Sequence, residues 1–83
     1  MKVLYFAWLR ERTGTAEEHI ELPEAVKTGM DLMLWLKQRD EGYDYAFEDP
    51  DLIRIAADQE HVEADADITQ AREVAFFPPM TGG

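Results

Sequence analysis

Thr28-Gly29-Met30-Asp31-Leu32-Met33-Leu34-Trp35-Leu36-Lys37-Gln38-Arg39-Asp40 is the stretch of sequence that decides the fold. Asp31 stands three residues after Thr28, which is the spacing of a helix N-cap whose side chains satisfy the first N–H groups of the helix. The stretch therefore predicts a helix from about Gly29 to Asp40. Gly42 lies just beyond it and predicts a left-handed turn that ends the helix.

Two apolar stripes run along this helix. Leu32, Trp35 and Leu36 recur at i, i+3 and i+4, which predicts the face that is buried against a sheet. Met30 and Leu34 fall roughly opposite. That second pair is either a surface for self-association or an ordinary pair of exposed apolar side chains, and the ordinary interpretation is favoured because scattered exposed apolar residues are common.

The sequence before the helix predicts a hairpin of two strands. Residues 2–9 are rich in aromatic and aliphatic residues on both alternating faces, as in a strand at the centre of a sheet. Thr13-Gly14-Thr15 predicts a turn, and a second strand is expected over residues 17–22, closed by Pro23.

The sequence after the helix predicts one loop and then three strands. The expected segments are an acidic and aromatic loop over residues 43–50 with at most one short turn, a strand over 52–57, a tight turn at Asp58-Gln59-Glu60, a strand over 61–63, a loop over 65–70 anchored by Ile68, and a last strand over 73–77 that Pro78-Pro79 ends.

This order of elements is β-β-α-β-β-β, which predicts an α+β fold. One main helix crossing a face of a mixed sheet of four to five strands, with the first and last strands adjacent and parallel, is the β-grasp arrangement of ubiquitin-like domains. We expect one domain over residues 1–77 and an extended tail over residues 78–83.

Composition narrows the possible partners and chemistry. Eighteen acidic against eight basic side chains give a formal charge of −10, which repels nucleic acid and favours either a basic protein partner or simply solubility. The chain has no cysteine, so sulfur chemistry cannot use a side-chain thiol. The apolar run from Val3 to Leu9 is too short to span a bilayer, and a cytoplasmic protein without membrane attachment is expected.

Candidate side chains for catalysis are scarce. The sequence contains no serine and no glycine-rich phosphate loop. His19 and His61 have no partner at metal-ligand spacing, so no metal or bound cofactor is expected. Glu17 and Glu18 are interpreted as a solvated face rather than as a catalytic pair. We therefore expect no side-chain active site.

The remaining chemical feature is the tail. Pro78 and Pro79 stiffen the exit from the last strand, and Met80-Thr81 leads to Gly82-Gly83. Glycine has no Cβ, so this end can enter a channel too narrow for other residues. A carboxylate is a poor electrophile, and we expect a partner enzyme to activate it with ATP before sulfur is attached.

Two segments carry a resemblance to a known family. The segment from Glu73 to Gly83 resembles the terminal signature of the small subunits of molybdopterin synthase, a family of sulfur-carrier proteins with the ubiquitin-like β-grasp fold. Residues 3–7, followed by Arg10-Glu11 and Gly14, are similar to the opening strand and turn of that family. The sequence departs from the family pattern at Ala71-Arg72 and at Asp58, which are turn positions.

The resemblance implies a function for the tail. An E1-like adenylating enzyme would convert the Gly83 carboxylate to an acyl-adenylate, and a sulfur donor protein would supply the sulfur of a thiocarboxylate. The tail would then enter the large subunit, in a heterotetramer, to build the dithiolene of molybdopterin in two rounds. ATP would be used by the activating enzyme and not bound by this chain.

The resemblance also implies which residues meet the partner. Gly82 and Gly83 form the reactive end, and Pro78, Pro79, Met80 and Thr81 thread the channel of the large subunit. Phe6 and Phe77 match family positions near the partner surface, although both could instead be core aromatics.

Three other functions remain open. The chain could carry sulfur for another product, such as the thiamin thiazole or a thiolated tRNA. It could be a ubiquitin-like modifier that forms isopeptide bonds, or a β-grasp interaction module in which the two glycines are a coincidence.

Overall fold

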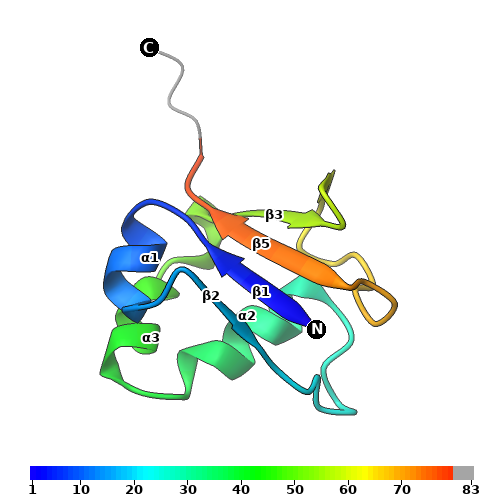
Figure 1. Cartoon of the computed structure of the whole chain (residues 1–83), viewed down its shortest axis with the longest axis horizontal. Helices are drawn as coiled ribbons and strands as arrows, with labels where there is room; N and C mark the ends of the chain where they lie inside the picture. Colours follow the sequence, from blue (N-terminus) through cyan, green and yellow to red (C-terminus); the bar gives the residue numbers. More distant parts are fainter. Residues whose placement is uncertain (80–83) are drawn as a thin grey trace.

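The computed structural model describes residues 1–79 and contains a five-stranded mixed sheet in the order β2-β1-β5-β3-β4 (Figure 1). In chain order its elements are β1 (Lys2–Tyr5), α1 (Trp8–Thr13), β2 (Glu17–His19), α2 (Gly29–Lys37), α3 (Glu41–Ala46), the 3-10 helix η1 (Pro50–Leu52), β3 (Arg54–Ala57), β4 (Glu60–Val62) and β5 (Glu73–Phe77). Strands β1 and β5 pair in parallel at the centre, and the other neighbours pair antiparallel. The predicted β-grasp fold is confirmed.

The core lies between the sheet and the helices. Alternation along the two central strands turns Val3 and Tyr5 of β1, and Val74 and Phe76 of β5, toward the helices, and all four are buried. Leucines of α1 and α2 and the aromatic residue after α3 belong to the same core cluster. The opposite face of the sheet is covered by no helix of the described residues.

The start of α2 agrees with the sequence prediction. Thr28 Oγ1 accepts a hydrogen bond from the Asp31 N–H at 3.1 Å, and the Asp31 carboxylate accepts one from the Thr28 N–H at 3.2 Å. Hydrogen bonds from the backbone N–H groups of Lys27 and Thr28 hold the pKa of Asp31 below its ordinary value. The capping box therefore fixes the first turn of the helix.

The end of α2 lies earlier than predicted. The helix stops at Lys37, because Asp40 has a different role: its Oδ1 accepts a hydrogen bond from the Tyr43 N–H at 3.0 Å and caps α3. Leu32 and Leu36 are buried as predicted, whereas Trp35 is only half-buried.

The second apolar stripe of α2 also differs from the prediction. Met33, which belongs to neither predicted stripe, is fully buried, Met30 is half-buried and Leu34 is 45% exposed. The reason is that α2 packs on the sheet along one side and contacts α3 along another, so more than one stripe of this short helix is covered.

The prediction of one strand from Lys2 to Leu9 is wrong beyond Tyr5. Ala7 has a φ of 53° and a ψ of −130°, which turns the chain away from the sheet, and α1 begins at Trp8. Leu9 is fully buried in the core from this helix. Gly14 ends α1 with a φ of 81°, and its N–H donates to the Arg10 carbonyl at 2.9 Å.

The predicted loop over residues 43–50 is wrong in its first half. It contains most of α3, and Tyr43, Ala46 and Phe47 are buried. Gly42 lies inside α3 and not in a left-handed turn. Glycine is required there because a Cβ would come within 2.6 Å of the Arg12 carbonyl oxygen, so the residue allows α1 and α3 to approach closely.

The remaining strands match the prediction with small shifts. β2 ends at His19 instead of residue 22, β3 starts at Arg54 instead of residue 52, and β4 covers Glu60–Val62 instead of residues 61–63. Asp58 and Gln59 form the predicted tight turn with positive φ values of 50° and 71°. Asp58 Oδ1 also accepts hydrogen bonds from the N–H groups of Arg72 and Glu73, so the positions that depart from the family pattern meet in space.

Within residues 1–79, no helix is both long enough and apolar enough to cross a membrane.

Candidate functional site

Phe6 and Phe77 lie side by side at one end of the sheet. Parallel pairing sets Tyr5 against Phe76, and the Phe6 N–H donates to the Phe76 carbonyl at 3.1 Å, so the next residue on each strand is also a neighbour. Phe6 is 49% exposed and Phe77 is half-buried. Neither belongs to the core cluster, which removes the alternative that both are core aromatics.

Phe77 is held on the open face of the sheet by its neighbours. The preceding residue, Phe76, points into the core and is fully buried, so alternation along β5 turns the Phe77 ring outward. The His61 ring of β4 lies edge-on to it, with 5.3 Å between ring centroids and 83° between planes. Arg54 stands opposite Phe77 in the antiparallel register of β3. These contacts give the ring a defined position while leaving one side accessible.

Pro78 and Pro79 follow β5 directly, and Figure 1 shows the chain leaving the sheet at this end of β5, next to the end of β1. Pro78 and Pro79 are half-buried and belong to no strand. Met80, Thr81, Gly82 and Gly83, which are the other predicted site residues, lie outside the described residues. The structure therefore brings together Phe6, Phe77 and the start of the tail.

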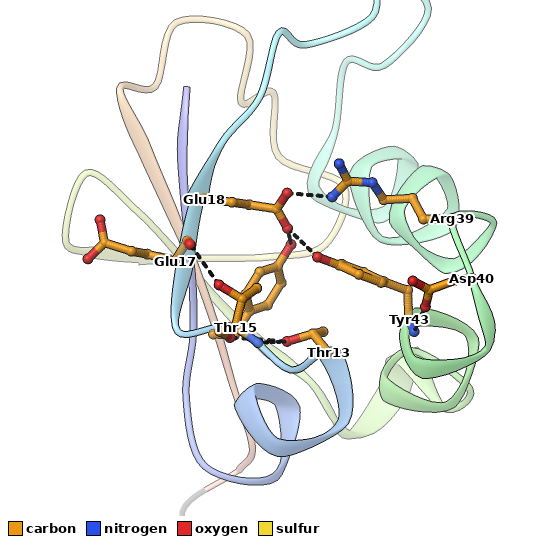
Figure 2. Close-up of polar contacts among 8 residues, drawn as sticks. Thr13, Thr15, Glu17, Glu18, Arg39, Asp40 and Tyr43 are labelled. Atoms are coloured by element: carbon orange, nitrogen blue, oxygen red, sulfur yellow. Dashed lines mark hydrogen bonds and ion pairs between the residues drawn. The ribbon is translucent and has the colours of Figure 1, made fainter.

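A polar cluster on the helix-covered side of the sheet is not predicted by the sequence. Figure 2 shows Glu18 of β2 pointing toward Arg39 and Tyr43. Glu18 Oε2 accepts hydrogen bonds from the hydroxyls of Tyr5 at 2.8 Å and Tyr43 at 2.6 Å. Its Oε1 accepts one from Arg39 Nη1 at 2.6 Å. The prediction that Glu18 belongs to a solvated face is wrong.

The protonation of this cluster follows from its contacts. Burial by itself raises the pKa of Glu18, but the hydrogen bonds from Tyr43, Arg39 and Tyr5 outweigh it and hold that pKa below its ordinary value. Burial and the hydrogen bond to Glu18 raise the pKa of Tyr43 to about 12, and burial raises the pKa of Tyr5 as well. At neutral pH the carboxylate is ionised and both hydroxyls are protonated. The cluster joins β2 to the α2–α3 region and offers no free proton donor or acceptor for catalysis.

In the described part of the chain, side chains that could bind a metal do not come together. No group of three His, Cys, Asp or Glu side chains is placed to hold a metal ion. An open groove of about 480 Å³ lies beside η1, β3 and β4, where Arg54 and His61 line it together with Asp51 and Glu63.

Comparison with known proteins assigns the chain to a family. The chain is 37% identical over 83 residues to the molybdopterin synthase sulfur carrier subunit of Escherichia coli, covering all of this chain and 99% of that protein. A solved structure from Pyrococcus furiosus, described as subunit 1 of a molybdopterin converting factor, superposes with a TM-score of 0.71 at 35% identity and covers 94% of each chain. SAMP1 from Haloferax volcanii shares the fold, with a TM-score of 0.71 at 24% identity over 100% of this chain and 98% of that one. The model of the ThiS family matches residues 3–83, and the chain is a member of this family.

Proposed function

We propose that the chain is the sulfur-carrier subunit of a molybdopterin synthase and that the Gly83 carboxyl group carries the sulfur. Full-length similarity to the Escherichia coli sulfur carrier subunit supports this proposal most directly. The position of Phe6 and Phe77 adds to it, because two accessible aromatic rings beside the origin of the tail suit a carrier that must dock before its tail enters another protein.

The chemistry takes place at the tail in two steps. An adenylating enzyme binds ATP, the Gly83 carboxylate attacks the α-phosphorus, pyrophosphate leaves, and an acyl-adenylate forms. Sulfur at the oxidation level of sulfide, delivered by a sulfur donor protein, then forms a C–S bond while the C–O bond to AMP breaks. No electrons change hands, and the product is a thiocarboxylate that is a better nucleophile than the carboxylate.

Transfer of the sulfur takes place in the large subunit of a heterotetramer in the cytoplasm. The thiocarboxylate sulfur attacks a carbon of a cyclic pyranopterin monophosphate: a C–S bond forms while a C–O bond at that carbon breaks, and the oxygen leaves with its phosphate or as water. Water then cleaves the bond between this sulfur and the Gly83 carbonyl carbon, which leaves sulfur on the pterin and restores the carboxylate. Two rounds build the dithiolene, and the catalytic side chains belong to the large subunit.

Docking brings together an acidic carrier and its partners. The charge of −10 favours encounter with basic surfaces. Phe6 and Phe77 provide the apolar contact at the sheet end, and residues 78–81 thread the channel behind them. We expect a Lys or Arg in the partner's channel to pair with the terminal charge, since a buried unpaired charge is costly.

Intact-mass spectrometry tests the sulfur step. After incubation with the adenylating enzyme, ATP and the sulfur donor, the chain should gain the mass difference between one sulfur and one oxygen. A variant with one extra residue after Gly83 should fold but show no gain. Sulfur transfer to the extended variant would refute the mechanism, and conjugates of higher mass in cell extract would indicate a ubiquitin-like modifier.

Calorimetric titration against the large subunit of the same organism tests the docking step. Phe6→Ala should weaken binding by at least about fivefold, since central aromatic side chains dominate interface energies. Leu34→Ala is the matched control, because Leu34 is also about half exposed but lies on α2. Equal effects of both substitutions would contradict docking at the sheet end. Formation of molybdopterin from the precursor then separates this pathway from other sulfur pathways.

A further inference from the structure

Ala7 adopts a backbone conformation that alanine disfavours. Its φ of 53° and ψ of −130° match the first central position of a type II′ turn, where a positive φ makes glycine the preferred residue. The turn is closed by a hydrogen bond from the Leu9 N–H to the Phe6 carbonyl at 3.1 Å. An L-residue at this position is strained by its Cβ.

The packing of the domain does not explain why alanine is present. Ala7 is exposed and its methyl group is not part of the core cluster. The turn is anchored on its far side by Leu9, which is fully buried. Glycine would adopt the same turn without strain. For stability alone, alanine is therefore the poorer residue at this position.

The location of the strained turn connects it to the docking step. Ala7 directly follows Phe6. The Phe6 N–H donates a hydrogen bond to the Phe76 carbonyl, and the Phe6 carbonyl accepts one from the Leu9 N–H. The conformation at Ala7 thus decides where β1 stops and how Phe6 stands beside Phe77. Strained residues gather at functional sites, where a fixed geometry is worth its cost in stability.

We propose that Ala7 is a positioning residue: its stiff turn holds Phe6 beside Phe77 before the large subunit arrives. This inference rests on the proposed function. Alanine samples far fewer backbone conformations than glycine, so the turn stays in one shape, and a preformed contact surface loses less entropy on binding. Part of the stability of the domain is given up for affinity.

Two substitutions separate strain from stiffness. Ala7→Gly removes the strain and also the stiffness. Replacement of L-Ala7 by D-alanine removes the strain but keeps the stiffness, because inverting the signs of the observed angles gives −53° and +130°, which lie in a favoured region for an L-residue. The D-variant is accessible by ligation at Ala16 followed by desulfurisation, which is clean because the chain has no cysteine.

Thermal unfolding and binding to the large subunit should distinguish the two variants. D-alanine should raise Tm by about 4 °C or more while binding stays within about twofold of wild type. Ala7→Gly should raise Tm less, because the unfolded chain gains freedom. It should weaken binding by about threefold to tenfold, and the ¹⁵N heteronuclear NOE of Phe6 and Trp8 should fall. Ala25→Gly, at an exposed position without positive φ, is the control and should leave binding unchanged.

Each failure has a distinct meaning. If Ala7→Gly binds as tightly as wild type, the positioning role is refuted while the proposed function stands. If D-alanine does not raise Tm, the strain is absent and the inference fails on its structural side. If the wild-type chain does not bind the large subunit, the proposed function fails, and this inference fails with it.

Discussion

Glu18→Ala should be among the most destabilising single changes outside the apolar core. The substitution removes the acceptor for the hydroxyls of Tyr5 and Tyr43, which are both buried. A hydrogen bond to a charged group contributes about 1.5–3 kcal/mol, and two such bonds give about 3 kcal/mol at the lower figure. The ion pair with Arg39 adds little, since the Arg39 side chain is 34% exposed and exposed pairs contribute about 0–1 kcal/mol.

Urea unfolding measures this loss. With the m-value unchanged, at about 1 kcal/mol/M for a small domain, the midpoint should fall by about 3 M. Glu17→Ala is the matched control, because the neighbouring carboxylate forms only an exposed ion pair with Lys2 at 3.4 Å and its loss should stay within about 1 kcal/mol. Equal midpoints for the two variants would refute the view that the Glu18 cluster stabilises the fold. A double-mutant cycle with Tyr43→Phe should give a positive coupling energy.

The same cluster predicts a pH dependence. The pKa of Glu18 is lower in the folded chain than its ordinary value, so ionised Glu18 stabilises the fold above the unfolded pKa of about 4.3. This contribution is lost as the pH falls through the folded pKa. The difference in unfolding free energy between wild type and Glu18→Gln should therefore be constant near neutral pH and shrink below about pH 4. A difference that grows on acidification would contradict this assignment.

Substitutions at three further positions test other parts of the structure. Phe47→Ala should cost about 3–5 kcal/mol in thermal unfolding, because the ring is fully buried with its centroid 5.2 Å from that of Phe76; a loss under about 1 kcal/mol would mean that this segment is not in the core. Thr28→Ala should cost about 1 kcal/mol and Thr28→Ser much less, and equal losses in urea unfolding would argue against the capping box. Leu34→Glu should leave the mass measured by light scattering unchanged, since Leu34 is exposed beside a half-buried Met30; a lower mass would reveal self-association through α2.

The parts of the fold that the sequence predicts correctly depend on local chemistry. The capping box of α2 lies within four consecutive residues, the turn at Asp58-Gln59 is formed by two adjacent residues between β3 and β4, and the last strand is bounded by Pro78. Alternation over residues 73–77 separates the buried Phe76 from the outward Phe77. These signals remain visible in a short window of sequence.

The missed elements depend on contacts between distant segments. α1 and α3 are six residues long each, which is too short for a helical period to stand out. They are stabilised by packing on each other, and Gly42 is required by a backbone 30 residues earlier in the chain, at Arg12. The positive φ of Ala7 contradicts the preference of alanine, so no propensity predicts it. The Glu18 cluster joins four residues from Tyr5 to Tyr43, and no sequence spacing links them.

The surface formed by Phe6 and Phe77 depends on the parallel pairing of β1 with β5. The central strand of the sheet is the last one in the sequence, so the hydrophobic core cannot close until residues 73–77 have been synthesised and released. Phe6 and Phe77 lie far apart in the sequence and become neighbours only when β1 and β5 pair. A chain in which β5 is missing or has not paired with β1 therefore does not present both rings at one end of the sheet.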